Sequence, residues 1–108
     1  MAALYDRLRA DVVTAMKARD TATLLALRTA DAAIQRAAMD QGKPVDDPLV
    51  TATLRKAVKN LADARAEFVK GGRTDLVAAN DFEIGLLEHY LPAGLDAARL
   101  DALIGAAP

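Results

Sequence analysis

Apolar side chains recur every three or four residues along most of this sequence, and this spacing limits the chain to helices. Near the N-terminus, Leu4, Leu8, Val12 and Met16 follow one another at steps of four. They form one stripe of a helix that ends at about Ala18. No segment shows the alternation of apolar and polar residues that a half-buried strand requires. The pattern therefore predicts an all-α fold.

Capping signals divide the middle of the chain into two further helices. Asp20 is a good N-cap for a second helix, which ends where Gln41-Gly42 interrupts the pattern. Asp47 is the expected N-cap of a third helix, because Pro48 then occupies the first helical position, where its missing N–H costs nothing. Gly71-Gly72 ends this helix by supplying a left-handed conformation. The apolar faces carry Leu24, Leu27, Ile34 and Ala38 in the second helix and Leu54, Val58, Leu61 and Phe68 in the third.

A fourth helix and a short fifth complete the expected fold. Thr74 is the expected N-cap of the fourth helix, and Pro92 ends it. Leu95-Asp96 opens the fifth helix, which has room for about two turns and needs to dock on the bundle or on a partner. Its apolar ridge consists of Leu100, Leu103 and Ile104. We expect residues 1–108 to form a single domain, an antiparallel helical bundle of four main helices plus a short C-terminal helix.

The composition excludes several kinds of site. With 53% hydrophobic but only 4% aromatic residues, the core must be built from aliphatic side chains and alanines. The sequence has no cysteine, which rules out disulfides, zinc–thiolate sites and cysteine nucleophiles. No uncharged run exceeds seven residues, which is too short for the apolar part of a signal peptide or for a membrane span. We expect a cytoplasmic protein that binds no membrane and no cofactor.

The net charge of −1 hides an uneven distribution of charge along the chain. Residues 1–48 carry seven basic and seven acidic side chains, whereas residues 49–73 carry six basic and two acidic ones. Residues 74–108 carry one basic and six acidic side chains. The sequence therefore predicts a polarised surface, either as two solvated faces that attract each other or as a binding site.

The basic segment supplies the candidates for contact with nucleic-acid phosphates. At 100° per residue on a helix, Arg55, Lys59 and Lys70 lie within about 60° of one another and away from the apolar face. They can form one stripe, and the alternative is an ordinary solvated face. No aromatic residue is interleaved with them, so a stacking platform for single strands is not expected. The full candidate set is Arg55, Lys56, Lys59, Lys70 and Arg73.

Three charged residues fall on the predicted apolar faces of the second, third and fourth helices. They are Asp31, Arg65 and Glu83. Because an unpaired buried charge is costly, we expect a structural ion pair between helices in which Arg65 binds Asp31 or Glu83. One arginine and two carboxylates, without a nucleophile or a glycine loop, make a poor catalytic set.

The only histidine, His89, follows Glu88 in the sequence. Adjacent helical residues differ by about 100° in direction, so these two side chains cannot easily converge for acid–base chemistry. With no second histidine and no thiolate, a metal site is not expected either. The sequence therefore offers no catalytic residue.

A longer pattern spans the end of the third helix and the whole of the fourth. It consists of Phe68-Val69-Lys70-Gly71-Gly72-Arg73-Thr74-Asp75-Leu76, followed by Glu83-Ile84, Leu87 and Tyr90-Leu91-Pro92. This pattern resembles the signature of the GatB/YqeY family. Leu27-Arg28 with Ala33-Ile34 is similar to the second-helix pattern of the same family, and the likeness is weaker before Leu54.

The resemblance implies an α-helical module that occurs as a free-standing small protein or as the tail of the B subunit of glutamine-dependent tRNA amidotransferases. In that enzyme the tail helps to hold tRNA, while the amide chemistry occurs in other domains. The resemblance thus predicts a non-catalytic accessory module that binds tRNA or an amidotransferase subunit. The enzymatic association is with carbon-nitrogen ligases that use glutamine as amide donor, and we expect no activity from this chain alone.

Two features of the chain differ from the family pattern. Relatives usually carry two basic residues in the middle of the third helix, where this chain has Leu61-Ala62. They also continue into a further helical segment, which we expect this chain to lack. The alternative function is therefore a helical module for protein–protein interaction or self-association, with no RNA role.

Overall fold

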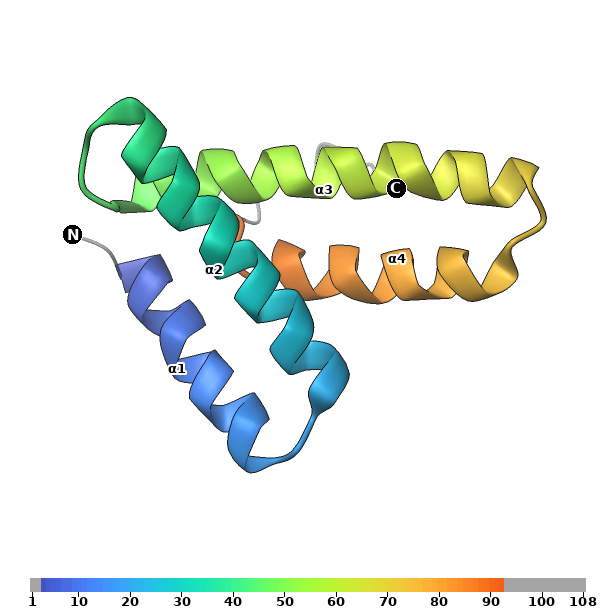
Figure 1. Ribbon diagram of the computed structural model, residues 1–108, viewed down its shortest axis with the longest axis horizontal. Helices are drawn as coiled ribbons and strands as arrows, with labels where there is room; N and C mark the ends of the chain where they lie inside the picture. Colours follow the sequence, from blue (N-terminus) through green and yellow to red (C-terminus); the bar gives the residue numbers. More distant parts are fainter. Residues whose placement is uncertain (1–2, 93–108) are drawn as a thin grey trace.

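The computed structural model describes residues 3–92, and these form four α-helices (Figure 1). The helices are α1 (Ala3–Lys17), α2 (Thr21–Gln41), α3 (Asp47–Lys70) and α4 (Thr74–Glu88). Within residues 3–92 there is no β-strand, so the prediction of an all-α fold with four main helices is confirmed. The expected short fifth helix, with Leu100, Leu103 and Ile104, lies outside the described residues.

The four helices are arranged as two antiparallel hairpins that cross each other (Figure 1). In the first hairpin α1 packs along α2, and in the second α4 packs along α3. Helix α2 passes across the first part of α3, so that the far end of the α3–α4 hairpin projects beyond it. The helices are thus antiparallel within each hairpin but oblique between the hairpins.

The helix ends of the first hairpin follow the capping signals in the sequence. Asp20 caps α2, because its carboxylate accepts the backbone N–H of Thr23 at 3.2 Å. The helix ends at Gly42, whose φ of 63° lies in the left-handed region that favours glycine. Its N–H donates to the carbonyls of the last turn. Both predictions are confirmed.

The N-caps of the second hairpin differ from the predicted ones. Asp46, not Asp47, caps α3 by accepting the N–H of Leu49 at 2.9 Å. Asp47 occupies the first turn, and its carboxylate accepts the backbone N–H of Leu4 at 3.0 Å. Thr74 is the first residue of α4 rather than its cap, and the residue at the N-cap position, Arg73, makes no capping hydrogen bond with its side chain. The second carboxylate of the Asp46-Asp47 pair is therefore used to attach the start of α1 to the start of α3.

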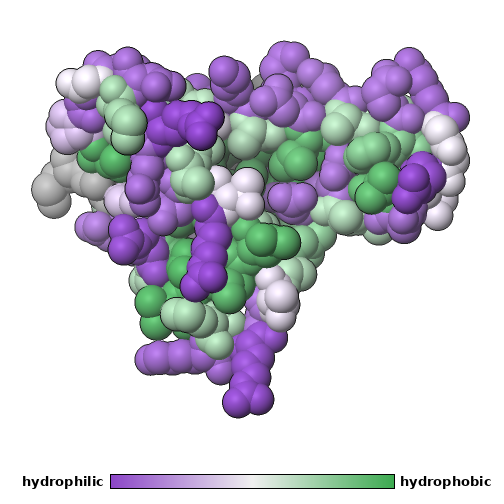
Figure 2. Space-filling view, viewed as in Figure 1, coloured by the Kyte–Doolittle hydropathy of each residue, from purple (hydrophilic) through white to green (hydrophobic). Residues whose placement is uncertain are grey.

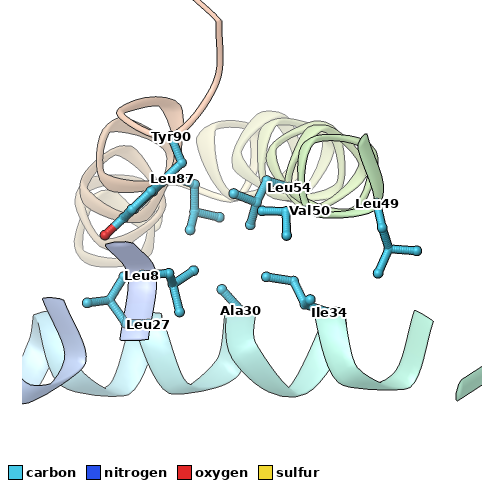
Figure 3. Packing of buried hydrophobic residues seen from close by; sticks show 9 residues of the cluster. All are labelled: Leu8, Leu27, Ala30, Ile34, Leu49, Val50, Leu54, Leu87 and Tyr90. Atoms are coloured by element: carbon cyan, nitrogen blue, oxygen red, sulfur yellow. The ribbon is translucent and has the colours of Figure 1, made fainter. Parts of the chain in front are cut away.

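The hydrophobic core lies where the two hairpins cross, and all four helices contribute to it (Figure 3). Figure 3 shows the α2 side chains pointing toward those of α3 and α4, with Leu8 of α1 beside Leu27. The buried cluster consists of Leu8, Leu27, Ala30, Ile34, Leu49, Val50, Leu54, Leu87 and Tyr90. Because the core is confined to the crossing, its burial fixes how the hairpins are oriented relative to each other.

Helix α3 is buried only in its first third. Its buried residues end at Leu54, and Phe68 near its far end is only partly buried. Among the described residues, the far ends of α3 and α4 lie against each other and beyond the reach of α2 (Figure 1). A polar contact joins the two helices closer to the core: Asn80, 8% exposed, donates from Nδ2 to the Leu61 carbonyl at 3.1 Å. The amide thereby satisfies a polar group that would otherwise be buried without a partner.

Tyr90 attaches the end of the described chain to α1. Its side chain is 3% exposed, and its hydroxyl donates to the carboxylate of Asp11. The Arg7 guanidinium lies 4.6 Å from the centre of the ring and donates to the His89 carbonyl at 2.8 Å. Burial, and then the bond to Asp11, raise the pKa of the Tyr90 hydroxyl well above its ordinary value.

An ion pair joins the projecting parts of α3 and α4. Arg65 donates from Nε and Nη2 to the two carboxylate oxygens of Asp81, at 2.5 and 3.3 Å. The partner therefore differs from the expected Asp31 or Glu83. Both side chains are about half exposed, 41% for Arg65 and 52% for Asp81. The reason is that α2 does not reach this part of α3, so the apolar face that carries Arg65 is open to water there.

We predict that Leu27→Ala destabilises the protein by about 3 kcal/mol, because it leaves a cavity at the crossing of the hairpins. Leu25→Ala is the matched control on the same helix, since Leu25 is 66% exposed and Leu27 is 0% exposed. The control should change the free energy of unfolding by less than about 0.5 kcal/mol. Urea denaturation of both variants checks this, and equal losses would contradict the described core.

We predict that Tyr90→Phe costs about 1–3 kcal/mol near pH 7, because it removes a hydrogen bond to a carboxylate. A raised pKa in the folded state means that the neutral hydroxyl stabilises the fold below the ordinary pKa of 10.0, and that this stability is lost at higher pH. The difference in the free energy of unfolding between wild type and Tyr90→Phe should therefore shrink above about pH 10. Denaturation curves measured from neutral to alkaline pH test this, and a constant difference would contradict it.

We predict only weak energetic coupling between Arg65 and Asp81, because exposed ion pairs contribute little and are screened by salt. A double-mutant cycle with Arg65→Ala and Asp81→Ala measures the coupling at low and high salt. A parallel cycle that pairs Arg65→Ala with Glu83→Ala is the control, and it should show no coupling energy. Strong coupling that does not depend on salt would mean that the pair is buried.

Candidate functional site

The five predicted phosphate-binding residues are all exposed, four on α3 and one in the turn after it. Arg55 and Lys59 are one turn apart, and Lys70 lies about 22 Å further along the helix from Arg55. This distance spans several phosphates of a nucleic-acid backbone. Arg73 immediately precedes α4. The structure therefore places the five residues along α3 and the turn that follows it, but not within one compact cluster.

Three of these cations already have acidic neighbours. The ammonium nitrogen of Lys59 lies 3.1 Å from Asp63, and that of Lys70 lies 3.4 Å from Glu67. Arg73 lies 3.1 Å from Asp75, and its hydrogen bond lowers the pKa of that carboxyl. These side chains are mostly exposed. Exposed pairs of this kind are weak, so the cations can exchange a carboxylate for a phosphate at little cost.

The other two cations, Arg55 and Lys56, make no ion pair within residues 3–92. They point in different directions, as expected for adjacent helical residues. Lys56 lines a hollow between α2 and α3 together with Arg36 and Asp40. Arg55 does not line that hollow and lies on the same side of α3 as Lys59. Arg55, Lys59 and Lys70 thus form the predicted stripe, and Lys56 lies at its edge toward α2.

A second surface feature is a groove that follows one flank of α2. It consists of three adjoining hollows of about 450, 280 and 620 Å³, which share lining residues from one to the next. α2 forms one wall along the whole groove, α3 forms the opposite wall at one end, and α4 forms it at the other. In Figure 2, hydrophobic side chains gather in the corner between the two hairpins, where this groove runs. We call it the α2 groove.

The α2 groove is apolar in its lining and charged near its ends. Alanines of α2 form much of its wall, and Leu25 and Phe82, which are 66% and 45% exposed, lie at one end. Glu83 is half-buried in the same part, and its carboxylate makes no hydrogen bond or ion pair with any residue of the described range. Arg36 and Lys56 lie at the other end. A groove of this kind suits an elongated amphipathic ligand.

The remaining predicted polar residues lie outside both surfaces. Asp31 accepts a hydrogen bond from the Tyr5 hydroxyl at 2.6 Å and another from the Gln35 amide at 3.0 Å, so it joins α1 to α2 rather than pairing with Arg65. His89 is exposed at the end of α4, where its carbonyl, not its imidazole, accepts from Arg7. Within the described part of the chain, no group of three acidic, histidine or cysteine side chains could hold a metal ion. None of the four helices is both long and apolar enough to cross a membrane.

Sequence reasoning missed the α2 groove, although part of the signal was present. Helical periodicity identifies which side chains share a face, but it does not say which stretch of that face another helix covers. The buried Asn80 is a second residue that sequence reasoning missed, and here the signal was clearer. Asn80 lies on the same stripe of α4 as Glu83 and Leu87. Its burial was predictable from the phase that identified Glu83.

Comparison with known proteins places the chain in a family. The sequence model of the family described as Yqey-like protein matches residues 5–107, which is nearly the whole chain. No curated protein matches it. Tyr90 belongs to the sequence pattern on which the resemblance rests, and the structure gives this residue a physical role, because Tyr90 attaches the end of α4 to α1. The match and the helical fold agree: the chain belongs to the YqeY-like protein family.

Proposed function

We propose that this chain is a non-catalytic accessory module of glutamine-dependent tRNA amidotransfer, and that it binds tRNA through the outer face of α3. Its place in the YqeY-like family supports the accessory role. The observation that carries the RNA contact is the row of exposed cations at Arg55, Lys59 and Lys70. Amidotransferase subunits are the protein partners that this role implies, and the amide chemistry would belong to them.

The geometry of the row suits a phosphate backbone better than base edges. The side chains of Arg55, Lys59 and Lys70 are spread along roughly 22 Å of helix and have no aromatic neighbour on the same face. Such contacts neutralise phosphates and release counterions without reading sequence. The mode of binding is therefore electrostatic, and Lys56 and Arg73 extend it at the two edges of the row.

We predict that tRNA affinity falls as salt rises, with a log–log slope of about −0.9 for each phosphate contact in duplex regions. Lys59→Glu should weaken binding and reduce the magnitude of that slope by about 1. Lys17→Glu is the matched control, because Lys17 is an exposed lysine in the last turn of α1, away from α3. Filter binding or fluorescence anisotropy at several salt concentrations measures both variants.

Two results would contradict the RNA contact. The first is an absence of tRNA binding at low salt. The second is an equal loss of affinity in Lys59→Glu and Lys17→Glu, which would show a response to net charge alone. Either result would leave the second candidate function, a protein-interaction or self-association module with no RNA role. The α2 groove, with its exposed Leu25 and Phe82, favours that function.

A further inference from the structure

We propose that the α2 groove binds a single amphipathic helix of a partner protein. The bound helix carries a basic residue that faces Glu83 and an acidic residue, about two turns away, that faces Arg36 and Lys56. This proposal rests on the protein-partner part of the proposed function, for which it specifies the chemistry of the partner. It does not depend on tRNA binding, because the row of Arg55, Lys59 and Lys70 lies on another face of α3.

The wall that α2 presents to the groove is made of small side chains at helical spacing. Ala26 and Ala30, which are only 6% and 5% exposed, form its floor, and the more exposed Ala22, Ala33 and Ala37 lie along its rim. Small residues allow two helix axes to approach to about 8 Å, which a strand or an extended peptide does not need. The groove runs from Ala22 to Asp40, a rise of about 27 Å, which is the length of a helix of about 18 residues.

The rim of the groove near α4 is apolar, so the bound helix needs an apolar face toward it. Leu25 and Phe82 stand on opposite sides of the largest hollow, one on α2 and one on α4, and both are largely exposed. A helix seated between them would remove both side chains from water, which favours binding. The apolar stripe of the bound helix therefore lies toward α2 and α4.

The charges of the groove give the bound helix a direction. Glu83 is half-buried and lacks a partner within residues 3–92, so a cation on the bound helix would satisfy its carboxylate. At the other end Arg36 and Lys56 outnumber Asp40, which favours an acidic residue. Along α2, Thr29 lines the groove together with Glu83, and Arg36 lines it together with Lys56; these two positions are about 10 Å apart. The basic and acidic residues of the ligand should therefore be about seven positions apart.

Two other occupants fit these features less well. In the segment 95–104 of this chain, Arg99 lies within three residues of both Asp96 and Asp101, so that segment cannot place opposite charges at the two ends of the groove. A second copy placed groove against groove would leave the hollows of both grooves unfilled. A helix from a different protein satisfies the shape, the length and the charge pattern together.

The test is a selection from displayed helical peptides of about 18 residues, made against the full chain. We expect the selected peptides to carry Lys or Arg about seven residues from Asp or Glu, beside an apolar stripe. Ala33→Leu should weaken their binding about tenfold, because the added side chain fills the groove. Ala32→Leu is the matched control, since Ala32 is the exposed neighbour that does not line the groove, and it should have no effect. Glu83→Lys should select for acidic residues at the position that was basic.

Several results would overturn the proposal. In the first, the selection enriches no helical peptide above a scrambled library. In the second, the selected peptides bind the Ala33→Leu and wild-type chains equally well. In the third, Glu83→Lys does not change which charge is selected. A dimer in light scattering that Ala33→Leu dissociates would identify a second copy as the occupant. A tenfold rise in peptide affinity on Leu100→Asp with Leu103→Asp would identify the chain's own C-terminal residues. The tRNA titration is separate, so failure here leaves the RNA contact untouched, and loss of RNA binding leaves this result untouched.

Discussion

The burial of Leu8, Leu27, Leu54 and Leu87 at the crossing of the two hairpins is the constraint on which the rest of the structure depends. Each hairpin alone offers one apolar face, and a single pair of helices of this length is too small to hold a core. The crossing joins the two faces into one cluster. Its oblique geometry has two consequences: the far end of the α3–α4 hairpin projects beyond α2, and no other helix of residues 3–92 covers one flank of α2.

The local parts of this fold were predictable from the sequence, because they depend on contacts between near neighbours. Asp20 and Gly42 are examples, since a cap needs only the adjacent turn of helix. The N-terminus of α3 was harder, because Asp46-Asp47 offers two carboxylates in a row. Which of them caps the helix is decided by Leu4, which uses the other one, and that contact joins residues far apart in the sequence.

The partner of Arg65 could not be predicted for the same reason. Its helical phase places it on the apolar face of α3 and leaves both α2 and α4 as possible sources of the partner. Whether that face is shielded from water depends on how far α2 extends along α3. A fully covered face would have required a buried pair with strong consequences for stability. The open hairpin instead supplies Asp81, on a more exposed side of α4, and the same opening accounts for the half-exposed charges. The helical phase thus gives the side of α3 on which a residue lies, whereas the burial of that side depends on where the hairpins cross.

The same crossing geometry places two surfaces, the basic row and the α2 groove, on different faces of α3. On α3 the outer face carries Arg55, Lys59 and Lys70, and the face toward α2 forms a wall of the α2 groove through Ala57 and Asn60. Between the two faces lies Lys56, the one member of the basic set that also lines the groove. A ligand in the groove that supplies an acid to Lys56 would remove a cation from the edge of the basic row. Occupation of the two surfaces would therefore be weakly antagonistic, and the effect would be electrostatic and largest at low salt.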